Sequence, residues 1–91
     1  MDIAIEFNPV SFKHGVSEAD IKMAFDTAKY DGFLERDDPD AEDKYLLIGF
    51  DCKANLIEVL YNVIADDRIR VFHAMKCRSA FIRLLGHRRE K

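Results

Sequence analysis

The sequence has few of the features that mark membrane and secreted proteins. No apolar run approaches the ~18 residues that a membrane-spanning helix needs. The first six residues include two acidic side chains and no basic one, so we expect no signal peptide. Only two cysteines are present, Cys52 and Cys77. Without a secretory segment, we expect them to be reduced thiols in a cytoplasmic protein that does not bind a membrane.

The common metal, phosphate and nucleophile motifs are missing as well. His73 and Cys77 are four positions apart, but no CxxC or HxxxH pair supports a zinc site with His14 or Cys52. The acidic segment 35–43 lacks the glycine of a calcium-binding EF-hand loop, so we interpret it as an exposed turn. There is no glycine-rich phosphate loop and no nucleophile elbow. We therefore expect neither a metal nor a cofactor.

What is present indicates one globular domain. A chain of 91 residues is long enough to bury roughly 60–65% of its unfolded surface. The hydrophobic share of 48% and the charged share of 34% are typical of a globular protein and argue against disorder throughout. We expect a single domain over residues 1–91, in which residues 87–91 form a frayed tail.

Charge is distributed unevenly along the chain. Residues 1–50 contain 12 acidic and 5 basic side chains, whereas residues 51–91 contain 5 acidic and 9 basic ones. The net charge of −3 argues against a protein that simply coats nucleic acid. The carboxyl-terminal part nevertheless carries a local positive field on an acidic body. This part is either a solvated basic helix and tail or a surface for a nucleic-acid backbone.

The first elements are predicted from alternation and capping. Residues 3–7 alternate as a short strand does. Ser17 and Asp20 have the spacing of a helix N-cap with a capping box, and Val16 and Ile21 are placed for a hydrophobic staple. A short helix with one apolar face should follow.

The rest of the chain predicts further strands and a second helix. Residues 45–50 are apolar at both odd and even positions, as in a central strand that is covered on both faces. Strands are also predicted over 56–64 and 68–73, with a weaker one at 33–34, and helical spacing follows over 77–85. The predicted fold is a small α+β domain with a central antiparallel sheet of about four strands, one short N-terminal helix and one C-terminal helix.

A three-residue turn at 65–67 gives the last two strands their most favourable register. It places Val63 opposite Ile69 and keeps Arg70 out of the core, where an unpaired guanidinium costs several kcal/mol. His73 then shares the face of Ile69, away from the strand arginines, unless a bulge turns it round. The other face is mixed, and is either a partly covered layer or a binding surface: Leu60, Asn62, Ile64, Arg68, Arg70 and Phe72.

Residues 68–78 contain the densest set of chemically useful side chains. Metal-independent RNA cleavage needs a base, an acid and cations that stabilise charge on the phosphate. His73 is the candidate proton-transfer group, because imidazole changes its charge near neutral pH. Lys76 is a second candidate catalytic residue, and Arg70, Lys76 and Arg78 are candidate phosphate ligands, with Phe72 placed to stack on a base. Alternatively, His73 is a core histidine.

Three segments together resemble one protein family. Residues 13–17 read KHGVS, residues 45–49 read YLLIG, and residues 67–74 read DRIRVFHA. In order and approximate spacing they resemble the BrnT-type toxins of type II toxin–antitoxin systems, and the similarity covers most of residues 7–85. The resemblance implies a RelE-like fold and endoribonuclease activity on mRNA. It also implies neutralisation by a small antitoxin of the ribbon-helix-helix type, and DNA binding only through the antitoxin complex.

The resemblance also implies site residues. Carried over to this chain, they are Lys13, His14, Arg68 and Arg70 as RNA contacts, together with His73. From its position, His14 either binds RNA or fixes the turn at Gly15.

One departure from the family pattern keeps a second hypothesis open. Met75 stands where the pattern has an arginine. A fold can keep its partner-binding surface and lose cleavage, so the alternative is a non-catalytic interaction module. It would bind its partner through the mixed face, at Leu60, Asn62 and Phe72.

Overall fold

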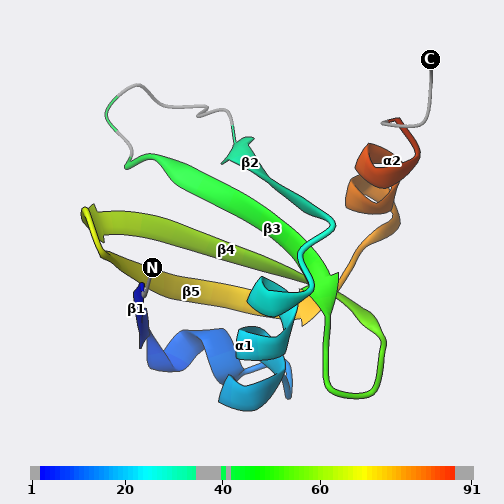
Figure 1. The fold of residues 1–91 in the computed structure, drawn as a ribbon, viewed down its shortest axis with the longest axis horizontal. Coiled ribbons are helices and arrows are strands. Elements are labelled where there is room, and N and C mark those ends of the chain that lie inside the picture. The colour runs from blue at the N-terminus through cyan, green and yellow to red at the C-terminus, as the bar shows by residue number, and fades with distance from the viewer. Residues whose placement is uncertain (1–2, 35–39, 41, 88–91) are drawn as a thin grey trace.

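Five strands, two α-helices and one short 3-10 helix make up the computed structural model, which describes residues 3–34, 40 and 42–87. Figure 1 shows them in chain order: β1 (Ala4–Phe7), η1 (Pro9–Phe12), α1 (Glu18–Asp26), β2 (Tyr30–Leu34), β3 (Lys44–Phe50), β4 (Leu56–Ala65), β5 (Arg68–Lys76) and α2 (Ser79–His87). No helix of the described residues is both long and apolar enough to cross a membrane.

The strands form one mixed sheet in the order β1-β5-β4-β3-β2. β1 runs parallel to β5, and the other neighbours are antiparallel. The α+β class and the antiparallel pairing of β2 to β5 are confirmed, but the sheet has five strands where about four were predicted, and β1 joins it in parallel. Alternation along residues 3–7 shows a strand, yet it does not show which neighbour that strand joins or in which direction.

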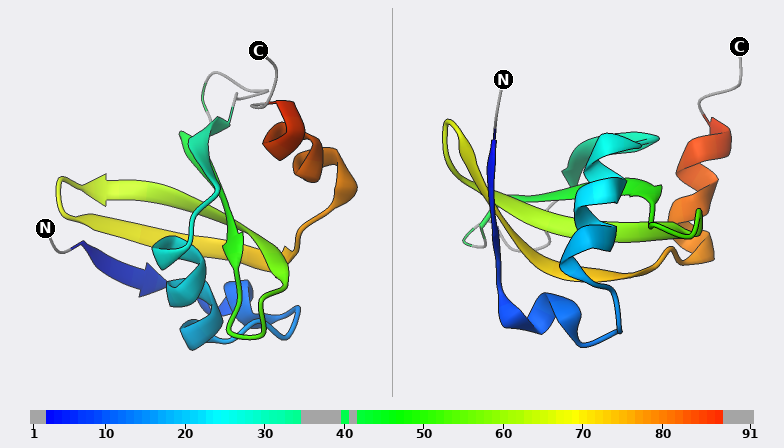
Figure 2. Two further views of the ribbon diagram at one scale, coloured as in Figure 1. Left: turned by 45° about the vertical axis from the view of Figure 1, so that its right-hand side comes forward. Right: turned by 60° about the horizontal axis from the view of Figure 1, so that its bottom comes forward.

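The interior strand β3 separates two apolar clusters, as its sequence predicts. The helices α1 and α2 lie on opposite sides of the sheet (Figure 2, left). It is buried from Leu46 to Gly49. The face covered by α1 and η1, here the α1 face, is built on Leu47, Ile57, Val59, Ile69, Val71 and Ala74. The opposite face, here the α2 face, is built on Leu46, Ile48 and Cys77, packed with Phe81, Leu84 and Leu85 of α2.

The predicted start of α1 is confirmed in detail. Ser17 Oγ accepts from the Asp20 backbone N–H at 3.1 Å, and Asp20 Oδ2 accepts from the Ser17 N–H at 3.1 Å. Val16 and Ile21 are both buried in the α1-face cluster. Asp20 does more than cap: its Oδ1 accepts from the Cys52 N–H at 3.0 Å, which ties α1 to the turn between β3 and β4.

Asp20 should therefore contribute stability that depends on pH. The Cys52 and Ser17 N–H groups lower the pKa of Asp20 from 3.8 to about 2. Because the folded pKa lies below the unfolded one, the contribution is present above pH 3.8 and is lost as the pH falls towards 2. Asp20→Ala should cost about 1 kcal/mol at neutral pH, after allowance for solvent screening. Urea unfolding of both proteins measures the difference, and a difference that persists unchanged at pH 2 would contradict this account.

Two irregularities shape the β4–β5 hairpin. Val63 pairs with Ile69, as predicted, and Tyr61 pairs with Val71 in the same register. The predicted three-residue turn is wrong, because Ala65 pairs with Arg68 and the extra residue lies within β4 instead.

The second irregularity reverses a prediction about the site. Leu60 pairs with His73 while Tyr61 pairs with Val71, so Phe72 is an inserted residue on β5. A bulge of this kind shifts the alternation of the strand by one residue. His73 therefore lies on the α2 face with Arg70, whereas the predicted regular register had placed it on the face of Ile69.

The chain after the bulge also differs from the prediction. β5 continues to Lys76, three residues beyond its predicted end, and α2 begins only at Ser79. Of the predicted tail 87–91, the first residue ends α2 and residues 88–91 lie outside the described residues. Most of the acidic segment predicted as a turn, residues 35–39 and 41, also lies outside them.

Candidate active site

Glu58 is the one charged residue, among those that the structure describes, whose side chain is fully buried. It lies on β4, in register between Ile48 of β3 and Met75 of β5, and so belongs to the α2 face. A buried carboxylate is costly unless charged or hydrogen-bonding partners surround it. The partners of Glu58 therefore define the polar centre of this face.

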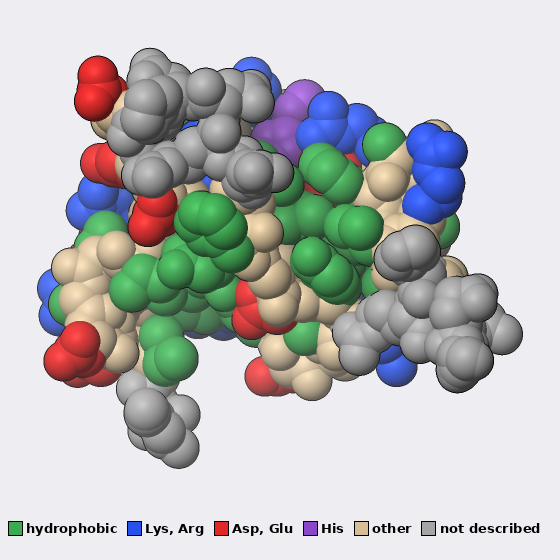
Figure 3. Space-filling view, turned by 90° about the horizontal axis from the view of Figure 1, so that it is seen from above, with side chains coloured by type: hydrophobic (Ala, Val, Ile, Leu, Met, Phe, Trp, Pro, Cys, Tyr) green, Lys and Arg blue, Asp and Glu red, His purple; other side chains and the backbone are tan. Residues whose placement is uncertain are grey.

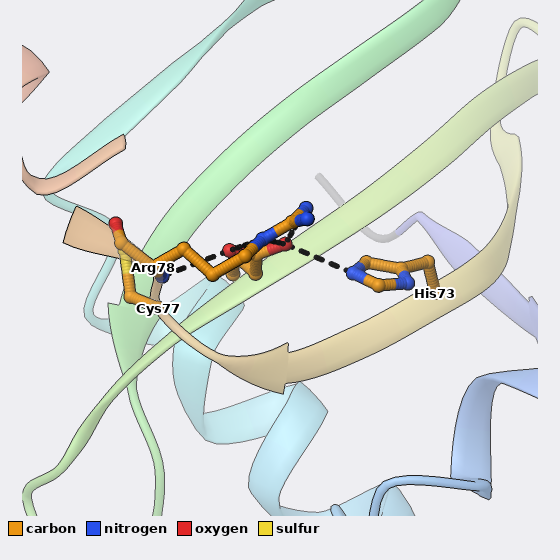
Figure 4. A network of polar contacts seen from close by, with 4 residues as sticks. His73, Cys77 and Arg78 are labelled. Carbon is orange, nitrogen blue, oxygen red and sulfur yellow. Dashed lines mark hydrogen bonds and ion pairs between the residues drawn. The ribbon is translucent and has the colours of Figure 1, made fainter. Parts of the chain in front are cut away.

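Arg78 and His73 supply those partners (Figure 4). The Arg78 backbone N–H donates to Glu58 Oε1 at 3.0 Å, its Nε lies 3.1 Å from both carboxylate oxygens, and its Nη2 donates to Oε2 at 2.6 Å. His73 Nε2 lies 2.9 Å from Oε2. The carboxylate thus joins β5 to the segment that leads into α2.

The network favours the ionised form of Glu58 and determines which ring nitrogen of His73 donates. Burial raises the pKa of Glu58, but hydrogen bonds from Arg78 and His73 outweigh it, so the pKa lies below its ordinary value. An ionised carboxylate only accepts hydrogen bonds, so His73 Nε2 must be the donor. In the neutral ring, Nδ1 is then the free acceptor.

Both partners of the buried carboxylate reach the surface. The His73 side chain is 20% exposed and that of Arg78 is 54% exposed. Arg78 binds Glu58 through Nε and Nη2, which leaves the N–H groups of Nη1 for a ligand. Its guanidinium also lies over the Phe81 ring, 5.2 Å from the centroid. Figure 3 shows histidine and basic side chains together along one margin of this face, beside an apolar surface.

A second imidazole lies next to the first. The rings of His14 and His73 are 5.7 Å apart between centroids and meet edge to face at 71°. His14 lies in the turn after η1, where Gly15 has a φ of 84° that glycine adopts without steric cost. His14 also lines a pocket of about 460 Å³ together with Lys76. The histidine pair therefore lies between the Glu58 network and this pocket.

The other predicted RNA-binding residues are less concentrated than expected. Lys76 pairs with Ile57 in the register, so it lies on the α1 face, away from the face of His73. Arg68 and Arg70 both form ion pairs with Glu6, at 3.4 and 3.1 Å. Lys13 is exposed at the end of η1.

The three predicted partner-binding residues are partly engaged within the chain. Leu60 packs against the cluster of α2, and the Asn62 side chain donates to the Asp43 carbonyl at 2.8 Å. Phe72 is the inserted residue of the bulge and is half-buried.

Sequence reasoning missed Glu58, the residue that organises the site. The available signal was one acidic residue within the apolar segment Leu56–Leu60. Glu58 is two positions from both Leu56 and Leu60, so in a strand all three side chains point to the same face. A charge at a core-facing position requires a partner, but the pattern does not identify which one.

Comparison with known proteins adds no assignment: no family model matches the sequence, and no curated protein matches it. The function must therefore be argued from the geometry of the site.

Replacing Glu58 by glutamine tests the network. Glu58→Gln keeps the volume but offers one acceptor oxygen in place of two, so we expect a loss of about 2 kcal/mol at pH 7. Because the folded pKa lies below 4.5, the wild-type contribution is present above that pH and is lost as the pH falls through the folded pKa. Unfolding measured at pH 7 and at successively lower pH should show the two proteins converging once the pH falls below 4.5. Equal stability at pH 7 would show that the network is not stabilising.

Proposed function

We propose that the protein is a metal-independent endoribonuclease of the BrnT-like, RelE-type class, acting as the toxin of a toxin–antitoxin pair. One observation carries the proposal: the imidazole of His73 is oriented by a buried carboxylate beside a second imidazole and an exposed guanidinium. This combination contains the base, the acid and the cation that phosphodiester cleavage requires.

The roles follow from the orientation of the groups. His73 Nδ1 takes the proton from the 2′-hydroxyl, whose oxygen attacks the adjacent phosphorus. The bond from phosphorus to the 5′-oxygen breaks, and a protonated His14 gives that oxygen its proton. The products are a 2′,3′-cyclic phosphate and a 5′-hydroxyl. Arg78 Nη1 stabilises the charge on the phosphate, and Lys76, which lines the same pocket as His14, binds the neighbouring backbone.

The partners proposed for this function come from the family resemblance. They are mRNA, a small antitoxin of the ribbon-helix-helix type, and operator DNA bound only through that antitoxin. In this proposal the protein acts in the cytoplasm, and Lys13, Arg68 and Arg70 contact the RNA outside the reacting group.

A non-catalytic interaction module on the same fold is the second candidate. The ion pairs of Arg68 and Arg70 with Glu6, and of Arg78 with Glu58, favour it, because each reduces the positive field available to RNA.

Purified protein incubated with RNA in excess EDTA separates the two candidates. An oligonucleotide with one ribonucleotide in a DNA strand is the sharpest substrate, and an all-DNA strand is its control. The endoribonuclease should cut only after the ribonucleotide and leave a cyclic phosphate. If RNA stays intact in this assay, and induced expression neither slows growth nor depletes cellular mRNA, the interaction module is the better description.

A further inference from the structure

Part of the α1 face is not covered by α1. The helix has 9 residues and is therefore about 14 Å long, whereas the 10 residues of β4 extend for roughly 33 Å. The β4–β5 turn reaches well beyond α1 (Figure 1). Ile3, Phe33 and Val63 lie on the uncovered part, and all three are exposed. A sheet face is normally covered by another layer, so this apolar area lacks one within the described residues.

A row of four aromatic rings in mutual contact forms the base of the uncovered area, here called its aromatic floor. Phe33 meets Tyr45 at 5.7 Å, Tyr45 stacks on Tyr61 at 5.4 Å, and Tyr61 meets Phe25 at 5.4 Å, between ring centroids. The Tyr61 hydroxyl donates to Asp31 at 2.6 Å, which holds the central ring in place. Rings held in this way lose little conformational entropy when a ligand covers them.

Two pockets open along this area, and their charged lining is of one sign. The larger, of about 540 Å³, lies between α1 and β1 and contains Asp26 and Asp31. The smaller, of about 300 Å³, lies beside Tyr45 and Val63 and contains Glu42 and Asp43. All four charged residues that line the two pockets are acidic.

The combination of apolar floor and acidic rim restricts the occupant. Nucleic acids and anionic lipid surfaces are repelled by the carboxylates. A second copy docked symmetrically by this face would place the same acidic rims against each other. The partner that fits is apolar on one side and basic at its margins. The central rings of this area, Tyr45 and Tyr61, lie on the interior strands β3 and β4, so a partner that covers them contacts side chains, as a helix lying on a sheet does.

We propose that this area, which we call the uncovered shelf, binds an amphipathic basic helix of a partner protein. Its apolar side lies on Phe33, Tyr45 and Val63, and its basic residues face Asp26 and Asp31. The shelf is on the opposite side of the sheet from the Glu58 network. Binding here is therefore compatible with an occupied His73 site, and the inference holds whether or not the protein cleaves RNA.

A pair of labelled synthetic peptides tests the proposal on the full chain. One is an amphipathic leucine–lysine helix, and the other has glutamate at every lysine position. Fluorescence anisotropy should show binding of the lysine peptide only. Val63→Asn, which changes no charge, should weaken binding about tenfold. Val10→Asn is the matched control, because Val10 and Val63 are each 53% exposed and Val10 lies in η1.

Any of four peptide-binding results would overturn the inference: equal binding of both peptides, no binding of the lysine peptide up to ~1 mM, unchanged binding to Val63→Asn, or equal weakening by Val10→Asn. Sedimentation of the wild type provides a further check. A concentration-dependent dimer that Val63→Asn abolishes would instead assign the shelf to a second copy. His73→Ala should retain peptide binding, so failure of the proposed ribonuclease and failure of this inference are separate results.

Discussion

Replacing His73 by alanine is expected to lower the rate of RNA cleavage by ~10²–10⁴-fold, the usual contribution of a positioned acid or base. Its ring is oriented by Glu58 on one side and lies beside His14 on the other. The variant loses the proton acceptor at Nδ1 and leaves the Arg78–Glu58 ion pair in place. Single-turnover cleavage of the one-ribonucleotide substrate measures the effect.

The controls for this prediction separate chemistry from folding. His87→Ala replaces the third histidine of the chain, at the last residue of α2, and should cleave as the wild type does. Thermal unfolding checks that His73→Ala remains folded. A folded His73→Ala protein with wild-type activity would remove His73 from the mechanism, and the same test on His14→Ala examines the proposed acid.

Gly49→Ala is expected to destabilise the protein by about 3 kcal/mol, at the upper end of the usual cost of overpacking a core. Gly49 lies on β3 where α1 crosses it, and an added Cβ would overlap the backbone oxygen of Ala24. Neither the strand nor the helix backbone can move aside without disturbing the buried layer around Leu47 and Ile21. For a domain of this size the melting temperature should fall by roughly 10–20 °C.

The same substitution elsewhere in the chain should have the opposite effect. Gly86 lies in α2, and an added Cβ there would have no atom within 4 Å. Gly86→Ala should therefore stabilise the protein by about 0.5–1 kcal/mol through helix propensity. If calorimetry gave Gly49→Ala and Gly86→Ala similar melting temperatures, the close packing of α1 on β3 would not explain the effect of Gly49→Ala on stability.

Local sequence patterns were sufficient for most of the elements. The Ser17 capping box, the Val16–Ile21 staple and the doubly buried β3 all depend on neighbours within a few residues or on simple alternation. These are short-range effects, so the chain displays them directly. The basic cluster near the carboxyl end was visible for the same reason.

The environment of that cluster was not visible, because its counter-charges come from distant parts of the chain. Glu6 reaches Arg68 and Arg70 from β1, across sequence separations of 62 and 64 residues. Glu58 reaches Arg78 across 20 residues. Strand pairing brings these carboxylates to the cations, and the pairing partner of β1 could not be derived from its own alternation.

The sequence by itself determined where most of the strands and helices lie and which faces of their regular stretches are apolar, because those depend on local backbone preference and periodicity. Only the tertiary structure decided that His73 lies beside Arg78 and Glu58. One inserted residue, Phe72, turns the rest of β5 over relative to its neighbour. Such a bulge relieves a mismatch between two strands, so it is a property of the pair and not of either sequence alone.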